Sequence, residues 1–163
     1  MDLDEAFEAY VDDLYRYLYS LSKNHHTAED LIQETFYRAY LQLAEDDIHH
    51  IKPWLFKVAY HAFIDHIRKH KRLVITDEVH NRINMKTPEM DLLAKEGFVA
   101  LMNDIHSLKV TEMHALVLCD LHRLSLKEAA DILQINLNTL KSHLSRGRKK
   151  VIERVKERRR QDG

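Results

Sequence analysis

Polar and cationic side chains recur at helical spacing near the end of the chain, in the stretch NTLKSHLSRGRKK. Short polar side chains on one helix face can hydrogen-bond to base edges in a major groove, and cations beside them can bind phosphates. By helical angle the outward face of this stretch consists of Asn138, Ser142, Ser145, Arg146 and Lys149, with Lys141 and Arg148 at its flanks. We expect this face to contact duplex DNA. The alternative is an ordinary helical hairpin with a solvated outer face.

The residues around this face have the spacing of a helix-turn-helix. Ser125 and Glu128 can form a capping box for a short helix that ends near Leu133, and Asn136 can cap a longer second helix. The small side chains at 129–130 permit a close approach of the two helices. The predicted inner stripe of the second helix consists of Leu140, Leu144, Gly147, Val151 and Val155.

Charge is distributed unevenly along the chain, although the net charge is only −1. Residues 2–13 include six acidic residues and no basic ones, whereas residues 141–160 include ten basic residues against two acidic ones. The basic end is the electrostatic candidate for phosphate contact. Cations that complement a helix dipole on a solvated helix end would give the same count.

A second candidate interaction face lies on the stretch TAEDLIQETFYRAYLQL. Thr27 can cap this helix, with Asp30 at its third position. The predicted buried stripe consists of Ala28, Ile32, Phe36, Ala39, Tyr40 and Leu43, whereas a separate face carries Asp30, Gln33, Glu34 and Tyr37. Carboxylates and an amide beside a tyrosine suit a separable protein interface, and a solvated helix face is the alternative.

A third helix is predicted through PWLFKVAYHAFIDHIRKHKR, with Pro53 in its first turn. Its apolar part is broad, but four residues fall within one outward sector and form a cationic strip. These are Lys57, His61, Arg68 and Arg72.

Composition and periodicity indicate an all-α protein of two small helical domains. The 163 residues are 45% apolar and 31% charged, and 3 Gly and 2 Pro leave little material for a turn-rich β fold. We expect an N-terminal helical bundle over 1–72, a flexible linker over 73–90 and a helix-turn-helix domain over 91–160. The apolar stripe predicted for the first helix consists of Phe7, Tyr10, Val11, Leu14, Tyr17, Leu18 and Leu21.

Several function classes are disfavoured by the residues present. No apolar run approaches the length of a membrane span and the N-terminus is acidic, so we expect a cytoplasmic protein. No set of nucleophile, base and orienting group can be assembled, and there is no Gly-rich phosphate loop. His66 and His70 have chelating spacing but no further ligands, and Cys119 has no partner cysteine. We therefore expect no catalytic residues, no metal, no cofactor and no small-molecule substrate.

These motifs, taken in order, resemble bacterial RNA polymerase sigma factors of the extracytoplasmic function (ECF) group. The resemblance implies that the AEDLIQETF helix, through Asp30, Gln33, Glu34 and Tyr37, docks on the β′ subunit of core polymerase. It implies that the WLFKVAYHAFIDHIRKHKR helix handles the minus-ten promoter element and helps to melt it. It also implies that the TLKSHLSRGRKK helix reads the minus-thirty-five element, with Lys149 and Lys150 adding phosphate contacts.

The implied contacts can be assigned to residues of this sequence. For the minus-ten element they are Lys57, His61, Arg68, Lys69 and Arg72, and for the minus-thirty-five element they are Asn138, Lys141, Ser142, Ser145, Arg146 and Lys149. The resemblance further implies contact with the polymerase β subunit, capture of a flipped base by the loop 45–52, and restraint by an anti-sigma factor, often membrane-anchored. His143 stands where many relatives have Arg, so the upstream base preference can differ from theirs.

Two other functions remain open on the residues alone. A stand-alone helix-turn-helix regulator would bind duplex operators as a dimer and use its N-terminal half as a sensor. A helical adaptor would bind only proteins, and its basic tail would be solubilising. The regulator does not explain the polar face of the second helix or the cationic third helix, which a sigma factor uses together.

Overall fold

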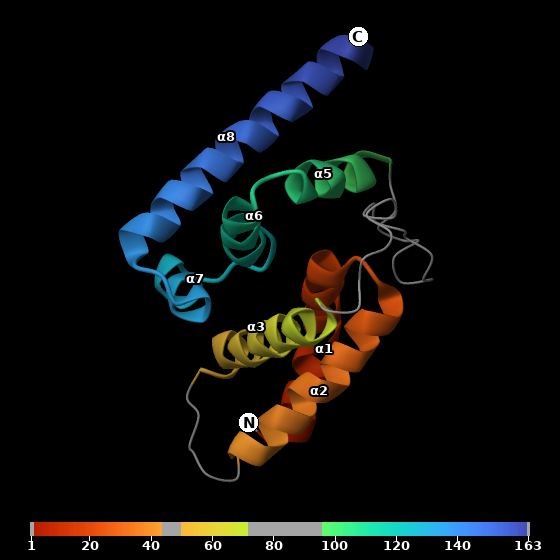
Figure 1. The fold of residues 1–163 in the computed structure, drawn as a ribbon, viewed down its shortest axis with the longest axis vertical. Helices are drawn as coiled ribbons and strands as arrows, with labels where there is room; N and C mark the ends of the chain where they lie inside the picture. The colour runs from red at the N-terminus through yellow and green to blue at the C-terminus, as the bar shows by residue number, and fades with distance from the viewer. Residues whose placement is uncertain (1, 44–49, 72–95, 163) are drawn as a thin grey trace. The chain divides into compact units, whose positions relative to one another are not determined.

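The computed structural model describes residues 2–43, 50–71 and 96–162, and every regular element among them is helical (Figure 1). The predicted all-α class is confirmed. The chain divides into two compact units, Met1–Arg82 and Ile83–Gly163. The predicted linker, most of the predicted loop 45–52, and Arg72 lie outside the described residues.

The first unit consists of three helices that all contact one another: α1 (Leu3–Ser22), α2 (His25–Leu43) and α3 (Ile51–His70). Helix α1 starts from a capping box in which the Asp2 carboxylate accepts from the Glu5 N–H at 2.8 Å. The fully buried side chains at the centre of this bundle include Leu14, Tyr17 and Phe56. Burying these side chains is the main stabilising contribution to the bundle.

The start of α2 differs from the prediction. The helix begins at His25, and the Asn24 side chain accepts a hydrogen bond from the Thr27 N–H at 3.0 Å. Thr27 is therefore inside the first turn, and the predicted cap is wrong by three residues. Both residue types are good caps, and Asn24 precedes Thr27 in the chain.

The buried stripes of α1 and α2 are also partly different from those predicted. Tyr40 is 66% exposed and Phe7 is 44% exposed, whereas Leu31 and Thr35 are buried. Helix α2 packs against both α1 and α3, and this determines which of its sides is buried. The buried side is centred on Ala28, Leu31, Ile32, Thr35 and Ala39. Tyr40 lies at the edge of this side and is exposed. Phe7 retains an edge-to-face contact with the ring of Phe36, with centroids 4.8 Å apart.

The second unit comprises α5 (Glu96–His106), α6 (Val110–Leu116), a π-helical turn η2 (Val117–Leu121), α7 (Leu126–Leu133) and the long α8 (Leu137–Asp162). Helices α5, α6 and α7 all contact α8, which runs along one side of the unit (Figure 1). The π-helical turn continues α6 directly. The core of the second unit includes Met102, Ile105, Leu118, Ile132 and Leu140.

The helix-turn-helix has the local structure that its sequence predicts. The Ser125 hydroxyl accepts from the Glu128 N–H at 3.1 Å, and the Glu128 carboxylate accepts from the Ser125 N–H at 2.8 Å, so the capping box is confirmed. Gln134 turns the chain in the left-handed region, at φ 56°. The Asn136 side chain then accepts from the Thr139 N–H at 2.7 Å, which confirms the predicted cap of α8.

Gly147 permits a close approach of α8 to α6. A β-carbon at this position would lie 3.3 Å from the Glu112 carbonyl oxygen and 3.7 Å from a Leu108 methyl carbon. Leu140, Leu144 and Gly147 are buried, as the predicted inner stripe requires. Val151 and Val155, the last two members of that stripe, are only half-buried.

Candidate nucleic-acid and protein interfaces

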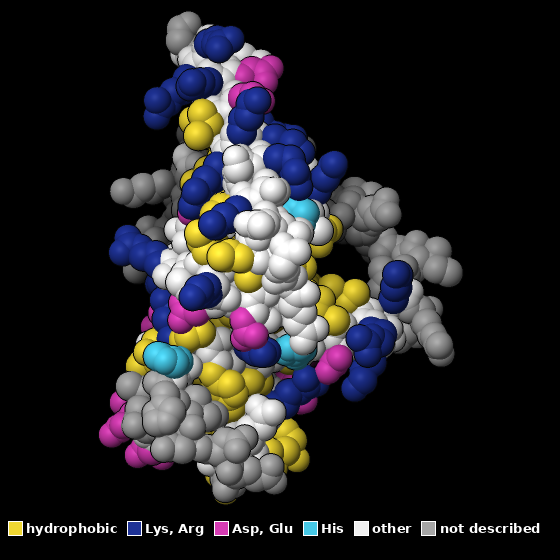
Figure 2. Space-filling model, turned by 90° about the vertical axis from the view of Figure 1, so that its left-hand side faces the viewer, with side chains coloured by type: hydrophobic (Ala, Val, Ile, Leu, Met, Phe, Trp, Pro, Cys, Tyr) yellow, Lys and Arg dark blue, Asp and Glu magenta, His cyan; other side chains and the backbone are white. Residues whose placement is uncertain are grey.

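The outward face of α8 is solvent-exposed at each position predicted to contact DNA. Asn138, Lys141, Ser142, Ser145, Arg146 and Lys149 all have exposed side chains. The same side of α8 forms a shallow groove whose lining includes Lys141, Ser145, Lys149 and the exposed Ile152. In Figure 2, lysine and arginine side chains gather in the upper part of the view. This face can offer hydrogen-bond donors and acceptors to base edges and cations to phosphates.

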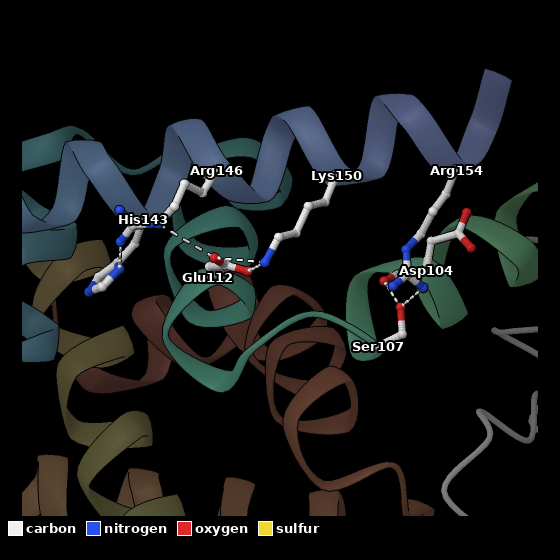
Figure 3. Close-up of polar contacts among 7 residues, drawn as sticks. All are labelled: Asp104, Ser107, Glu112, His143, Arg146, Lys150 and Arg154. Carbon is white, nitrogen blue, oxygen red and sulfur yellow. Dashed lines mark hydrogen bonds and ion pairs between the residues drawn. The ribbon is translucent and has the colours of Figure 1, made fainter. Parts of the chain in front are cut away.

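Half of the ten basic residues in 141–160 form ion pairs or hydrogen bonds with other side chains of the second unit. Arg148 donates to both carboxylate oxygens of Asp120 at 2.8 and 2.6 Å, and Arg158 pairs with Asp104. Arg154 donates to the Ser107 hydroxyl (Figure 3). The basic residues of α8 that form neither an ion pair nor a side-chain hydrogen bond within the described part of the unit are Lys141, Lys149, Lys156, Arg159 and Arg160. The charge count from the sequence therefore overstates the cations that are available to a ligand.

Glu112 is a buried carboxylate at the centre of the α6–α8 contact, with only 1% of its surface exposed. Lys150 donates to its two oxygens at 2.8 and 3.1 Å (Figure 3). The hydrogen bond from Lys150 lowers the pKa of Glu112 despite the opposing effect of burial. The resemblance implies a phosphate contact for Lys150, but its ammonium group donates to Glu112 instead. No pattern in the sequence indicates this pair, because its members are 38 residues apart.

Arg146 lies between the outward face and this buried carboxylate. Its Nε is 3.6 Å from Glu112 Oε2, and its Nη2 is 3.0 Å from His143 Nδ1, which accepts the hydrogen bond (Figure 3). The side chain nevertheless remains 56% exposed. Arg146 is thus held on one side and open to solvent on the other.

The predicted protein-binding face of α2 is exposed along its whole length. Asp30, Gln33, Glu34 and Tyr37 are all exposed, and Tyr37 is 60% accessible. Tyr40 and Leu41 extend this face with further apolar surface, which the sequence reasoning missed because it placed Tyr40 in the core. A combination of acidic groups and exposed aromatic surface is typical of an interface with a cationic protein partner.

One end of the α2 face is connected to α3 by ion pairs. Arg38 is 2.9 Å from Glu34 and 2.9 Å from Asp65. The pKa of Arg38 is raised, chiefly by the hydrogen bond to Glu34. Arg68 is a further 4.0 Å from Asp65. This chain of charges joins the acidic face of α2 to the cationic strip of α3.

Three members of the cationic strip of α3, Lys57, His61 and Arg68, lie among the described residues, as does Lys69, which the resemblance adds to them. Lys57 and His61 are half-buried, whereas Arg68 and Lys69 are exposed. Lys57 and His61 line a groove between α2 and α3 together with Arg38, Leu41, Gln42, Trp54 and Val58. The apolar pattern of α3 predicts that Trp54 lies in its apolar part, and the position of Trp54 in this groove brings an indole ring beside cations. Such a groove can receive a stacked base.

The histidine and cysteine residues do not form a metal site in the part of the chain that the structure describes. The rings of His66 and His70 are stacked with centroids 4.1 Å apart, and His70 Nδ1 is 2.9 Å from the His66 carbonyl oxygen. Cys119 is half-buried, and burial raises the pKa of its thiol. Within residues 2–43, 50–71 and 96–162, no helix has the length and apolar character needed to cross a membrane.

Two family models match this chain in order. The model of Sigma-70 region 2 matches residues 6–73, which include most of α1 and all of α2 and α3, and the model of Sigma-70 region 4 matches residues 99–151. The ECF RNA polymerase sigma factor SigM of Bacillus subtilis is 39% identical over 155 residues, which cover 93% of each chain. The chain belongs to the ECF RNA polymerase sigma factors. SigW of the same organism is 30% identical over 165 residues, covering 94% of this chain and 88% of its own.

Solved structures of sigma factors share the fold of this family member. The sigma factor RpoE in complex with the anti-sigma factor NepR, from Bartonella quintana, superposes with a TM-score of 0.74 at 23% identity, covering 94% of this chain and 96% of that one. CnrH in complex with the cytosolic domain of CnrY gives a TM-score of 0.67 at 18% identity, covering 95% and 88%. The resemblance inferred from the three motifs is therefore confirmed at the level of family and fold.

Proposed function

We propose that this chain is a transcription initiation factor that binds core RNA polymerase and directs it to specific promoters. The observation that carries this proposal is the presence, in order, of the two sigma regions, each with a solvent-exposed face of suitable chemistry. The α2 face is acidic and aromatic, and the α8 face is polar and cationic. A stand-alone regulator would need the second face but has no evident use for the first.

The α8 face is proposed to read the upstream promoter element. Asn138, Ser142, Ser145 and Arg146 are exposed on the N-terminal half of α8, where short or forked side chains can reach base edges in the major groove. Lys141 and Lys149 are proposed to bind the flanking phosphates. Phosphate contacts position the helix on the duplex, and base contacts specify the sequence.

The α2 face is proposed to bind core polymerase through Asp30, Gln33, Glu34 and Tyr37. Their exposure leaves the carboxylates and the phenol ring available to a partner. Because Glu34 already contacts Arg38, part of its charge is committed within the unit. We expect Asp30 and Tyr37 to contribute most of the binding energy, with Tyr37 acting as an aromatic anchor.

The α3 helix is proposed to act on the downstream promoter element. Lys57, His61, Arg68 and Lys69, with Arg72 beyond the described residues, would bind the phosphate backbone of the strand that separates. Extruding a base from the stack costs a few kcal/mol, which stacking on a protein surface can offset. The groove that contains Trp54 supplies such a surface, beside Lys57 and His61.

The proposed domains are a region 2-like domain over 1–72 and a region 4-like domain over 91–160, joined by a linker. Because the sigma factor RpoE, which has a similar fold, has been captured with the anti-sigma factor NepR, we propose that a protein inhibitor also restrains this chain. The protein would act in the cytoplasm on RNA polymerase and promoter DNA. This role requires no catalytic group or cofactor from the chain itself.

The deciding experiment is transcription in vitro from a library of genomic fragments, with and without sigma-free bacterial core polymerase. We expect transcripts only when both proteins are present, with starts that share two spaced upstream elements. Retention of duplex fragments by the protein alone, without transcription, would instead support the stand-alone regulator. A protein that binds core polymerase but no DNA would support the adaptor.

A further inference from the structure

We propose that Glu112 is a positioning residue for promoter reading, because it fixes the direction in which Arg146 presents its guanidinium group to DNA. This inference rests on the proposed function of α8. Arg146 belongs to the reading face of α8, which consists of Asn138, Lys141, Ser142, Ser145, Arg146 and Lys149, and it also pairs with a buried group. Glu112 itself would touch no DNA.

The position of Glu112 depends on the close approach of two helices. Gly147 lacks a side chain where α8 meets the Glu112 backbone, so the Glu112 carboxylate reaches the space between Arg146 and Lys150. These two cations are four residues apart, which places them one turn apart on the same side of α8. Without the carboxylate they would repel each other.

Lys150 anchors the carboxylate and Arg146 responds to it. Lys150 donates to both oxygens at hydrogen-bond distances, whereas Arg146 Nε lies 3.6 Å from Oε2, an ion-pair distance. Because Glu112 is almost completely shielded from water, its field on Arg146 is screened less than that of an exposed carboxylate. Glu112 is therefore a negative charge held in one position behind the reading face, where it attracts the guanidinium group of Arg146.

The remaining donors of Arg146 are left for a ligand. Glu112 lies near Nε of Arg146, and His143 accepts a hydrogen bond from one N–H of Nη2. Both N–H groups of Nη1 and the second N–H of Nη2 therefore remain available as donors. Two N–H groups in this fixed fork match a base edge with two acceptors, such as guanine O6 and N7. Holding the side chain in place before DNA arrives reduces the entropy lost on binding.

Arg148 provides the contrast within the same helix. Its Nε and Nη2 both donate to Asp120, which is itself only partly buried, so this fork is closed on its own partner. Arg148 therefore serves as an anchor of α8 although about half of its side chain is exposed, whereas Arg146 keeps donors for a ligand. The Asp120–Arg148 pair is a matched control for the Glu112–Arg146 pair.

The test measures promoter discrimination by the full-length protein with core polymerase, on promoters changed one base pair at a time in the upstream element. Arg146→Ala identifies the base pair that Arg146 reads. We expect Glu112→Gln to reduce discrimination at that base pair by about tenfold and to leave the other positions unchanged. The double variant, Glu112→Gln with Arg146→Ala, should lose no more discrimination at that base pair than Arg146→Ala alone. Asp120→Asn should retain the wild-type profile.

A Glu112→Gln variant that keeps full discrimination at the Arg146 base pair would overturn the inference, as would an equal loss at every position. If this variant fails to fold, Glu112→Asp keeps the charge but shortens the side chain and withdraws the carboxylate from Arg146, and an unchanged profile for it would also overturn the inference. Wild-type protein that directs no promoter-specific transcription with core polymerase would instead refute the proposed function.

Discussion

The backbone of Gly147 lies against Glu112 so closely that a β-carbon on Gly147 would be 3.3 Å from the Glu112 carbonyl oxygen. We expect Gly147→Val to destabilise the second unit by about 1–3 kcal/mol, because the branched side chain forces α6 and α8 apart. Gly147→Ala should cost less, since the gain of about 0.5–1 kcal/mol in helix propensity offsets part of the crowding.

Urea unfolding separates this effect from the first unit. The only tryptophan is Trp54 in α3, so its fluorescence follows the first unit, whereas far-ultraviolet circular dichroism follows all helices. We expect the circular dichroism transition of Gly147→Val to shift and the fluorescence transition to stay in place. A variant as stable as the wild type in both signals would contradict the close packing described above.

His114 should make the second unit less stable in acid. Burial lowers the pKa of His114 to about 4, so between this pH and ~6.5 the folded protein keeps the ring neutral while the unfolded chain, with a pKa of ~6.5, takes up a proton. Its contribution is complete above pH ~6.5 and is lost as the pH falls toward 4, to a total of about 3 kcal/mol. We expect His114→Gln to flatten the pH dependence of the unfolding free energy between these values. Parallel curves for the two proteins would refute this assignment.

Reversal of charge on the α2 face should separate polymerase binding from folding. The double variant Asp30→Lys with Glu34→Lys is expected to abolish detectable binding to core polymerase, because the acidic face would then repel a cationic partner. Helical content should not change, since both residues are exposed. The matched control is Glu8→Lys with Asp12→Lys, which makes the same change in net charge at two exposed positions of α1. Equal binding by both double variants would rule out the proposed face.

Lys149 and Ser142 should differ in how their loss responds to salt. If Lys149 binds a phosphate, Lys149→Ala should weaken binding to all promoters and lower the slope of log affinity against log salt by roughly 0.9. Ser142→Ala should leave that slope unchanged and alter base preference instead. Binding of the polymerase holoenzyme to promoter duplexes over a range of salt concentrations measures both quantities. An unchanged slope for Lys149→Ala would remove this residue from the set of phosphate contacts.

The local signals in the sequence were sufficient for the helix-turn-helix. Ser125, Glu128 and Asn136 satisfy backbone groups within three residues of themselves, so their roles depend little on the rest of the fold. The same logic failed at α2, where two capping residues compete and Asn24 forms the hydrogen bond to the Thr27 N–H.

Tertiary contacts were much less predictable. Tyr40 continues the apolar period of α2, but the helix is covered by two neighbours in a sector that leaves this side chain 66% exposed. The pairs of Glu112 with Lys150 and of Asp104 with Arg158 join residues that are 38 and 54 positions apart. Nothing in the spacing or composition of the sequence identifies such partners. The sequence therefore gives the number of cations in the last helix, but it does not tell which of them are free to bind a ligand.

The long helix α8 alternates two kinds of position within one rigid element. Leu140, Leu144, Gly147 and Lys150 face the unit, and the exposed positions between them face outward. Substitutions on the outward side leave the packed side unchanged, so such a helix can acquire a new promoter preference without losing its fold. Arg146 is the exception, since a change there also alters the surroundings of Glu112. Among related factors, substitutions at positions 138 and 142 should therefore be independent of the rest of the unit. A substitution at position 146 of α8 should be accompanied by a change at position 112 of α6.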